Sequence, residues 1–360
     1  MDNLTDPFIT FNHEGHCNHC CTIFENKNKY LYQGDKSDKK LESIVQRVKK
    51  GGSNKQYDCI IGISGGVDSS YLMHLSKVWG LRPLAVHMDN GWNSKIAVSN
   101  VKNLLDNLDI ELCTYVLDWE DFKDLQLSFF KASVIEVENP TDMAIHGALH
   151  RIAKKFGIKY ILNAGNYASE GISPKHFQYG KKDYSYTKAI HKRFGNTSLR
   201  KYPSFSLWDE MVFKFIFNIK ILYPLNHLNY DKEKAKELLI SKYGWENYGG
   251  KHHESIMTKF VQSYYLFKKF DIDYRKATYS TMICNEQVSR DKALSYIKEI
   301  PYKDIDNDIK YIAKKFDIST EKFIEILNYP KKYYTDYPNS EKLLSFFYDK
   351  YDKFFRKGRD

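Results

Sequence analysis

The stretch Ser64-Gly65-Gly66-Val67-Asp68-Ser69-Ser70 has the residue types of a phosphate-binding loop. Two adjacent glycines let the backbone curl so that successive N–H groups point toward one anion. Three serine hydroxyls can donate to phosphate oxygens, and a helix after the loop would add unpaired N–H groups and its positive dipole end. The loop contains no lysine and lacks the spacing of a Walker A motif. An ordinary glycine–serine turn without a ligand is the alternative interpretation.

Asp68 lies within this loop, and a carboxylate beside phosphates is unfavourable unless a cation accompanies them. Mg²⁺ is the ion that normally bridges nucleotide phosphates. The sequence therefore makes Asp68 a candidate to orient or ligate Mg²⁺.

The segments around the loop predict an α/β fold with a doubly wound parallel sheet. Apolar runs at residues 59–63, 84–88, 111–117 and 159–163 alternate with segments of helical periodicity. In such sheets ligands bind beyond the carboxyl ends of the strands. Each turn is ordinary when taken alone, but its position after an apolar strand makes it a candidate binding element. These candidate residues are His87, Asp89, Asn90, Gly91, Gly165 and Asn166.

Two further segments frame the predicted sheet. A helix is expected over 143–156, with Asp142 acting first of all as its N-terminal cap. Residues 167–206 are basic and aromatic without a regular pattern, which fits either a solvated surface or a lid over the ligand. Glu170 in this segment is a weak candidate to position an acceptor.

A second group of reactive side chains precedes the sheet. Cys17-Asn18-His19-Cys20 is a CxxC pair, expected at a tight turn after a strand-like run at 7–11. Such a pair is half of a zinc knuckle, and Cys17 and Cys20 are therefore candidate Zn²⁺ ligands. A closed site needs four ligands, and free thiols are the alternative. The side chains that could complete the site are His13, His16, His19, Cys21, His252 and Cys284.

Residues 207–360 are expected to be helical, without a second sheet. An amphipathic helix over 230–243 ends at Gly244-Trp245, and Gly249-Gly250 then opens a polar cluster, Lys251-His252-His253-Glu254-Ser255. Lys251 could neutralise pyrophosphate, and His252 or Glu254 could bind a sugar or assist proton transfer. A capped helix start with a solvated Lys–His pair is the alternative. The predicted domains are 1–50, 51–206 and 207–360.

Composition limits the class of protein. The net charge of +10 and the pI of about 9.0 favour anionic partners, among them ATP, acidic sugars and nucleic acid. The N-terminus is polar and acidic, which is not typical of a signal peptide. The longest apolar stretch, 211–225, contains two lysines and a proline and is expected to be a core helix rather than a membrane span. The six cysteines fit a reducing compartment, so we expect a cytoplasmic protein.

Three stretches resemble known families. The loop at 64–70 resembles the SGGxDS pyrophosphate loop of the N-type ATP pyrophosphatases, the PP-loop superfamily with an adenine nucleotide α-hydrolase-like (HUP-like) fold. Residues 1–20, from Thr5-Asp6-Pro7 to the CxxC pair, are similar to the start of the N-acetyl sugar amidotransferases. In that family another CxxC stands before the position of Met1. Residues 244–262 meet the pattern GWxxYGGKHxES…TxFxQ of the same family nearly throughout.

The resemblance implies an activity. The family belongs to bacterial surface-polysaccharide and flagellin-glycan pathways, and cleaves ATP to AMP and pyrophosphate while an N-acetyl group becomes an acetamidino group. The strand-end residues would then flank adenine and ribose, and Asp142 would share in the site. Pseudaminic-type, legionaminic-type and mannuronic-type acceptors, some of them lipopolysaccharide sugars, stay open.

The resemblance also implies separate glutaminase and ammonia-channel subunits, since this chain has no glutaminase signature. A tRNA-modifying enzyme that uses the same loop for thiolation or lysidine formation is the rival interpretation. The positive charge and the CxxC pair fit it, whereas the 244–262 stretch does not, and we expect no nucleic acid and no membrane as partners.

Overall fold

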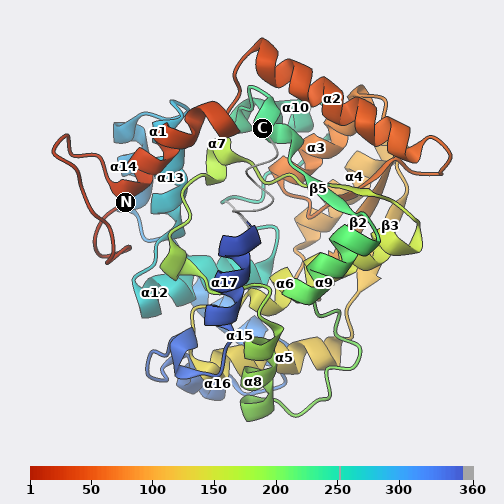
Figure 1. Cartoon of the computed structure of the whole chain (residues 1–360). Coiled ribbons are helices and arrows are strands. Elements are labelled where there is room, and N and C mark those ends of the chain that lie inside the picture. Colours follow the sequence, from red (N-terminus) through yellow and green to blue (C-terminus); the bar gives the residue numbers. More distant parts are fainter. Residues whose placement is uncertain (251–252, 352–360) are drawn as a thin grey trace.

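A parallel sheet of five strands forms the centre of the computed structural model, which describes residues 1–250 and 253–351 (Figure 1). The strand order is β3-β2-β1-β4-β5, and all neighbouring strands run parallel. The strands are β1 (Cys59–Gly62), β2 (Pro83–Asp89), β3 (Leu112–Val116), β4 (Tyr160–Leu162) and β5 (Lys220–Leu222). The α/β class with a doubly wound parallel sheet is therefore confirmed.

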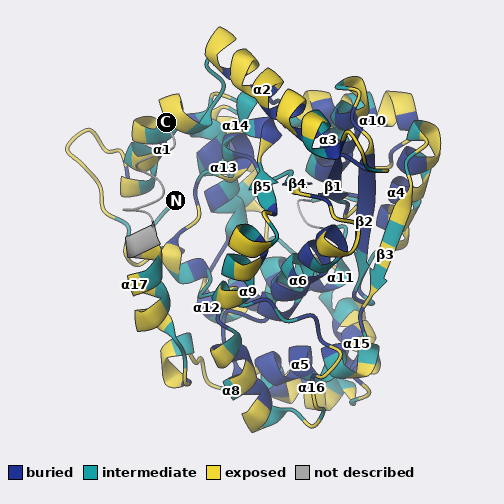
Figure 2. Cartoon of the chain, turned by 45° about the vertical axis from the view of Figure 1, so that its right-hand side comes forward, coloured by how far each residue is buried: buried dark blue, intermediate teal, exposed yellow. Residues whose placement is uncertain are grey.

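Helices cover both faces of the sheet. Successive side chains of a strand point to opposite faces, so Ile60 packs in one hydrophobic cluster whereas Cys59 and Ile61 pack in another. The second cluster is completed by α2 (Asp35–Gly52), α3 (Val67–Val78), α4 (Lys95–Leu108) and α10 (Lys232–Tyr243). The first contains α5 (Trp119–Ala132) and α6 (Asn139–Lys155). Figure 2 shows β1 and β2 buried between these layers, as parallel strands require.

The C-terminal part packs on the same core through α5. The ring of Phe130 contacts the rings of Phe260, Phe316 and Phe323. The elements here are α11 (Ile256–Phe260), η4 (Val261–Tyr265), α12 (Leu266–Phe270), α13 (Tyr274–Cys284), α14 (Arg290–Lys298), α15 (Ile305–Lys315), α16 (Thr320–Leu327), η5 (Tyr334–Asp336) and α17 (Glu341–Tyr351). Figure 1 shows α5, α15 and α16 gathered on one side of the molecule.

The stretch 211–225 does not form the core helix that its sequence predicted. This stretch contains the end of α9 (Leu207–Met211), the η2 turn (Val212–Ile216), strand β5 and the start of η3 (Pro224–His227). Strand β5 pairs with β4, with Tyr160 opposite Lys220 and Leu162 opposite Leu222. Asn218 has a φ of 55° and Pro224 follows the strand, so both ends of the run interrupt a helix. A three-residue strand is too short for its periodicity to be recognised.

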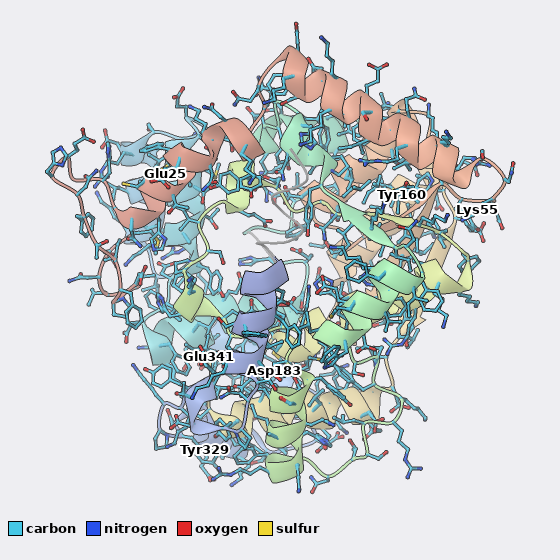
Figure 3. The ribbon with its side chains drawn as sticks, viewed as in Figure 1. Glu25, Lys55, Tyr160, Asp183, Tyr329 and Glu341 are labelled. Carbon is cyan, nitrogen blue, oxygen red and sulfur yellow. The ribbon has the colours of Figure 1, made fainter. Side chains whose placement is uncertain are left out.

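The segment 167–206 is more ordered than its sequence indicated. It contains α7 (Tyr167–Glu170), η1 (Lys175–Phe177) and α8 (Tyr184–Phe194). Figure 3 labels Asp183 at the start of α8 and Glu341 at the start of α17. The Asp183 carboxylate caps α8 and also accepts a hydrogen bond from the Ser340 amide at 2.6 Å. The bond between Asp183 and Ser340 therefore connects the start of α8 to the start of α17.

The cysteine pair does not lie at a turn after a strand. Residues 7–11 form no strand, and only an isolated bridge joins Phe11 to Cys17. Cys17 is the N-cap of α1 (Asn18–Tyr30), where its Sγ accepts from the Cys20 amide at 3.4 Å. Because Cys17 caps α1, Cys20 lies in the first turn of that helix. The pair therefore does not form the tight turn of a zinc knuckle. No helix within residues 1–250 or 253–351 is long and apolar enough to span a membrane.

Candidate active site

The glycine-rich loop lies at the point where the strand order reverses. The chain runs from β1 to β2 and β3 on one side and then returns to β4 on the other side of β1. The loop leaves β1 and leads into α3, whose first turn contains Asp68 and Ser69. Gly65 has a φ of +84°, and a Cβ there would lie 2.5 Å from the carbonyl oxygen of Ala97. Only glycine fits this position, because both the backbone conformation and the lack of space exclude a side chain.

Asp68 is the centre of a hydrogen-bond network at the loop. Its Oδ1 accepts from the Tyr230 hydroxyl at 2.5 Å and from Asn166 Nδ2 at 3.1 Å. Its Oδ2 accepts from Lys232 Nζ at 2.8 Å. Asn166 also caps α7 through the Ser169 amide. The loops after β1 and β4 are thus fixed to one another and to the start of α10.

Lys232 was missed by the sequence analysis. Burial works to lower the pKa of its ammonium, but the nearby carboxylates of Asp68, Glu170 and Glu254 outweigh burial and raise it. The ammonium therefore stays charged beside the loop. One feature could have indicated that Lys232 has an anionic partner. It is the first residue of α10, where the helix dipole disfavours a cation unless an anion compensates.

The stretch before α11 packs directly on the loop. The Trp245 indole donates to the Gly65 carbonyl at 3.0 Å, and the Glu246 backbone is joined to the Asn100 side chain by two hydrogen bonds of 2.8 Å. The Ser64 hydroxyl donates to Glu254 Oε1 at 3.5 Å. Glu254, which the sequence analysis made a candidate to bind a sugar or assist proton transfer, therefore lies at the loop. Lys251 and His252, the other predicted members of this cluster, lie outside the described residues.

A cavity of about 610 Å³ extends from the loop across the carboxyl ends of the strands. The predicted site residues that line it are Ser64, His87, Asn90, Asp142, Glu170 and Glu254. The ring of His87 is fixed in one tautomer, because its Nδ1 lies 2.8 Å from the Ile63 carbonyl and its Nε2 lies 3.1 Å from the Asn93 amide. The structure thus joins the loop and the strand ends in a single cavity.

Some predicted residues shape the site without lining the cavity. Asp89 accepts a hydrogen bond from the Gly91 amide at 2.9 Å, which closes the turn after β2. A Cβ on Gly91 would lie 2.8 Å from the Trp119 ring, so this glycine serves packing. The Gly165 amide donates to Asn163 Oδ1 at 2.7 Å and closes the turn after β4.

Asp142 does not cap its helix. Helix α6 begins at Asn139 with Glu138 as N-cap, so Asp142 lies in the first turn and binds Lys181 Nζ at 2.8 Å and Gln178 Nε2 at 3.0 Å. Burial alone would raise the pKa of Asp142, and the Lys181 ammonium outweighs burial and lowers it. Glu138 and Lys181 also line the cavity, and the sequence offered no sign that they would meet there.

The cysteine pair lies away from the cavity, at the N-terminus of α1. The two Sγ atoms of Cys17 and Cys20 are 3.4 Å apart, and Cys284, another candidate ligand, is a buried free cysteine at the end of α13. His19, a possible fourth ligand, contacts Asp6 at 2.5 Å instead. Within residues 1–250 and 253–351 no group of three or more His, Cys, Asp or Glu side chains is arranged to hold a metal ion. The predicted zinc site therefore has no support in the described part of the chain.

Comparisons with known proteins match two parts of the chain, a C-terminal segment to a described family and a stretch of 162 residues to a curated relative. Residues 254–352 match the family model described as LPS biosynthesis protein WbpG-like, C-terminal domain. The matched segment begins at Glu254, beside the glycine-rich loop. An uncharacterized protein of Methanocaldococcus jannaschii is 31% identical over 162 residues, which cover 44% of this chain and 54% of that protein. The chain thus spans about half the length of that curated relative.

Solved structures give a weaker likeness. NMN synthetase from Francisella tularensis is 15% identical, with 61% of this chain and 95% of that chain covered and a TM-score of 0.31. NH3-dependent NAD synthetase from Campylobacter jejuni is 14% identical over 74% of this chain and 98% of that chain, with a TM-score of 0.31. A tRNA thiolase from Methanococcus maripaludis is 12% identical over 70% and 78%, with a TM-score of 0.29. At such scores these likenesses carry no argument about this chain.

Proposed function

We propose that this protein is an ATP-dependent enzyme of bacterial surface-glycan biosynthesis that converts a sugar N-acetyl group into an acetamidino group. One observation carries the proposal: Ser64, the first residue of the loop, lines the same cavity as Glu254, the first residue of the segment matched by the WbpG-like domain. A loop of this kind suits phosphates, and the cavity of about 610 Å³ has room for an acceptor beside them.

The first step of the proposed reaction activates the amide. The carbonyl oxygen of the acceptor attacks the α-phosphorus of ATP, and pyrophosphate leaves. The loop N–H groups and the Lys232 ammonium would stabilise the charge that develops on the phosphates. Mg²⁺ would arrive with ATP, and the Glu254 carboxylate, which accepts from the Ser64 hydroxyl at 3.5 Å, could contact it. The metal would neutralise part of the phosphate charge.

The second step replaces AMP with nitrogen. Ammonia adds to the activated carbon and AMP leaves, so that the acetyl oxygen ends on AMP. We infer that ammonia comes from separate glutaminase and ammonia-channel subunits, because the sequence contains no glutaminase signature. An enzyme that uses ATP and a nucleotide-activated or acidic sugar would act in the cytoplasm.

An isotope experiment tests this function. The purified chain is incubated with ATP, Mg²⁺, ammonium chloride and UDP-linked diacetamido sugars whose acetyl oxygens carry a heavy isotope. We expect AMP and pyrophosphate in equal amounts, with the heavy oxygen in AMP. Formation of ADP, or of AMP without the label, would contradict the mechanism. Pyrophosphate release that depends on tRNA, with steeply salt-dependent tRNA binding, would favour the tRNA-modifying alternative.

A further inference from the structure

One carboxyl group on the cavity wall lies apart from the loop and its network. Glu138, the N-cap residue of α6, lines the cavity together with Ser64 and Glu254. Its Oε2 accepts from the Thr258 hydroxyl at 2.6 Å, and its Oε1 accepts from Gln126 Nε2 at 3.2 Å. Both donors are neutral. Each carboxylate oxygen has two lone pairs, so Glu138 is held in one orientation and can still accept a proton from the cavity.

The segment from Glu254 to Thr258 contacts both the phosphate loop and Glu138. Glu254 contacts the loop through Ser64, and Thr258 lies four residues further along the segment that becomes α11. Glu138, which accepts a hydrogen bond from Thr258, lines the same cavity as Ser64 of the phosphate loop, so a group bonded to the α-phosphate would share that space with Glu138.

The surroundings of Glu138 let it exchange a proton near neutral pH. Burial raises the pKa of its carboxyl to about 7. The Thr258 hydrogen bond opposes that shift, the Asp142 charge adds to it, and the Lys181 ammonium also opposes it. The other titratable side chains on the cavity wall are His87, Glu170, Glu254 and Tyr274.

We propose that Glu138 is the general base of the ammonia step, which accepts a proton from the nitrogen that joins the adenylated acceptor. The inference rests on the proposed function and assigns a residue to its second half-reaction. Ammonia forms a C–N bond to the activated carbon, which leaves a positive charge on nitrogen. Glu138 takes one proton from that nitrogen. The nitrogen lone pair then forms a C=N bond, the C–O bond breaks, and AMP leaves with the electron pair.

The test separates the two half-reactions in the full-length chain, with ammonium chloride as the nitrogen source. For Glu138→Gln we expect acceptor-dependent pyrophosphate release in a single turnover to change by less than about 3-fold, while amidine formation falls by about 10²–10⁴-fold. At a fixed concentration of free ammonia, the wild type should gain rate through about pH 7 and the variant should not.

Two matched variants separate proton transfer from support of the fold. Glu136 lies two residues away and is buried, but it binds Tyr186 and the Tyr179 amide and does not line the cavity. Glu136→Gln should keep both the amidine rate and the rise of rate with pH. Thr258→Val keeps Glu138 but removes its shortest hydrogen bond, so the pH at which the rate rises should move upward.

The outcomes distinguish the two proposals. If the wild type gives no acceptor-dependent pyrophosphate, the proposed function itself is wrong. If the wild type forms amidine and Glu138→Gln keeps both its rate and its pH dependence, only the role of Glu138 is overturned. If Glu138→Gln does not fold, an unchanged pH profile in Thr258→Val would overturn that role.

Discussion

The charge of Asp68 is met by groups from two distant parts of the chain. Asn166, Tyr230 and Lys232 all donate to its carboxylate, and the side chains of Asp68 and Lys232 are only 22% and 19% exposed. The sequence suggested that Asp68 orients Mg²⁺, which stays a prediction. The contacts add a second role, because the carboxylate holds the Lys232 ammonium beside the phosphate loop.

Removal of either member of this pair should stop ATP cleavage. We expect Asp68→Asn and Lys232→Met each to lower AMP formation by about 100-fold or more and to cost about 1–3 kcal/mol of stability, because each leaves a half-buried charge or acceptor unmatched. Pyrophosphate release and urea unfolding measure the two effects. The double variant should be less destabilised than the sum of the single variants. Wild-type turnover by Asp68→Asn would refute the site assignment.

The buried carboxyl of Glu136 predicts a pH-dependent stability. Burial raises the pKa of Glu136 from 4.5 to about 7 in the folded chain. Between these values the folded state binds more protons than the unfolded state, so the free energy of unfolding falls as pH rises. The contribution is fully present below about pH 4.5 and is lost through about pH 7, and it amounts to ~3 kcal/mol at most.

Glu136→Gln removes this titration. Urea unfolding at intervals between about pH 4.5 and 8 should show the wild type losing stability relative to the variant as pH rises. A difference between the two proteins that does not change with pH would show that Glu136 ionises normally.

At the scale of elements, the segment between α10 and α11 supports the loop. The Trp245 indole donates to the Gly65 carbonyl, and the Trp245 ring is 3% exposed. Contacts of this kind fix a loop that must present its N–H groups to phosphates. Backbone order in the loop therefore depends on a side chain 180 residues away.

Trp245→Phe should weaken ATP binding. The change removes one hydrogen bond and leaves a small cavity, so we expect a loss of about 1–3 kcal/mol in stability and a rise of roughly 3- to 10-fold in the KM for ATP. Trp208→Phe is the matched control, because Trp208 is 57% exposed on α9 and should change neither quantity. Equal effects of the two substitutions would mean that Trp245 does not support the loop.

At the scale of the whole molecule, one hydrophobic cluster joins the sheet to the C-terminal helices. It contains Ile60 of β1, Phe130 of α5, Phe260 of α11 and Phe323 of α16. The boundary predicted at residue 207 also separates β5 from its partner β4. Large aromatic side chains that pack across this boundary provide much of the apolar area buried on folding.

Fragments made at residue 207 should not fold by themselves. We expect residues 1–206 and 207–360, expressed separately, to lack cooperative unfolding and to expose apolar surface, because each loses half of a shared core. The intact chain should unfold in one transition. Near-ultraviolet circular dichroism and dye binding measure both properties. Cooperative unfolding of the isolated 207–360 fragment would support an independent domain instead.

The sequence by itself determined the fold class and the position of the loop. Alternating apolar runs and helical segments predicted four of the strands, because periodicity within a segment reflects which of its faces are buried. The glycines and serines at 64–70 predicted an anion site, because their conformational freedom and hydroxyl groups are local properties. Strand β5 and the helix at the cysteine pair were missed, since a three-residue strand and a capping thiol leave almost no local pattern.

Only the tertiary structure decided which polar side chains share the cavity. Glu138 and Thr258 are 120 residues apart, and they meet because α6 and α11 both face the carboxyl ends of the strands. Lys232 reaches Asp68 across 164 residues for a similar reason. The packing of whole elements brings such pairs together. The pKa values of their side chains then depend on burial and on neighbouring charges, and these neighbours come from several segments of the chain.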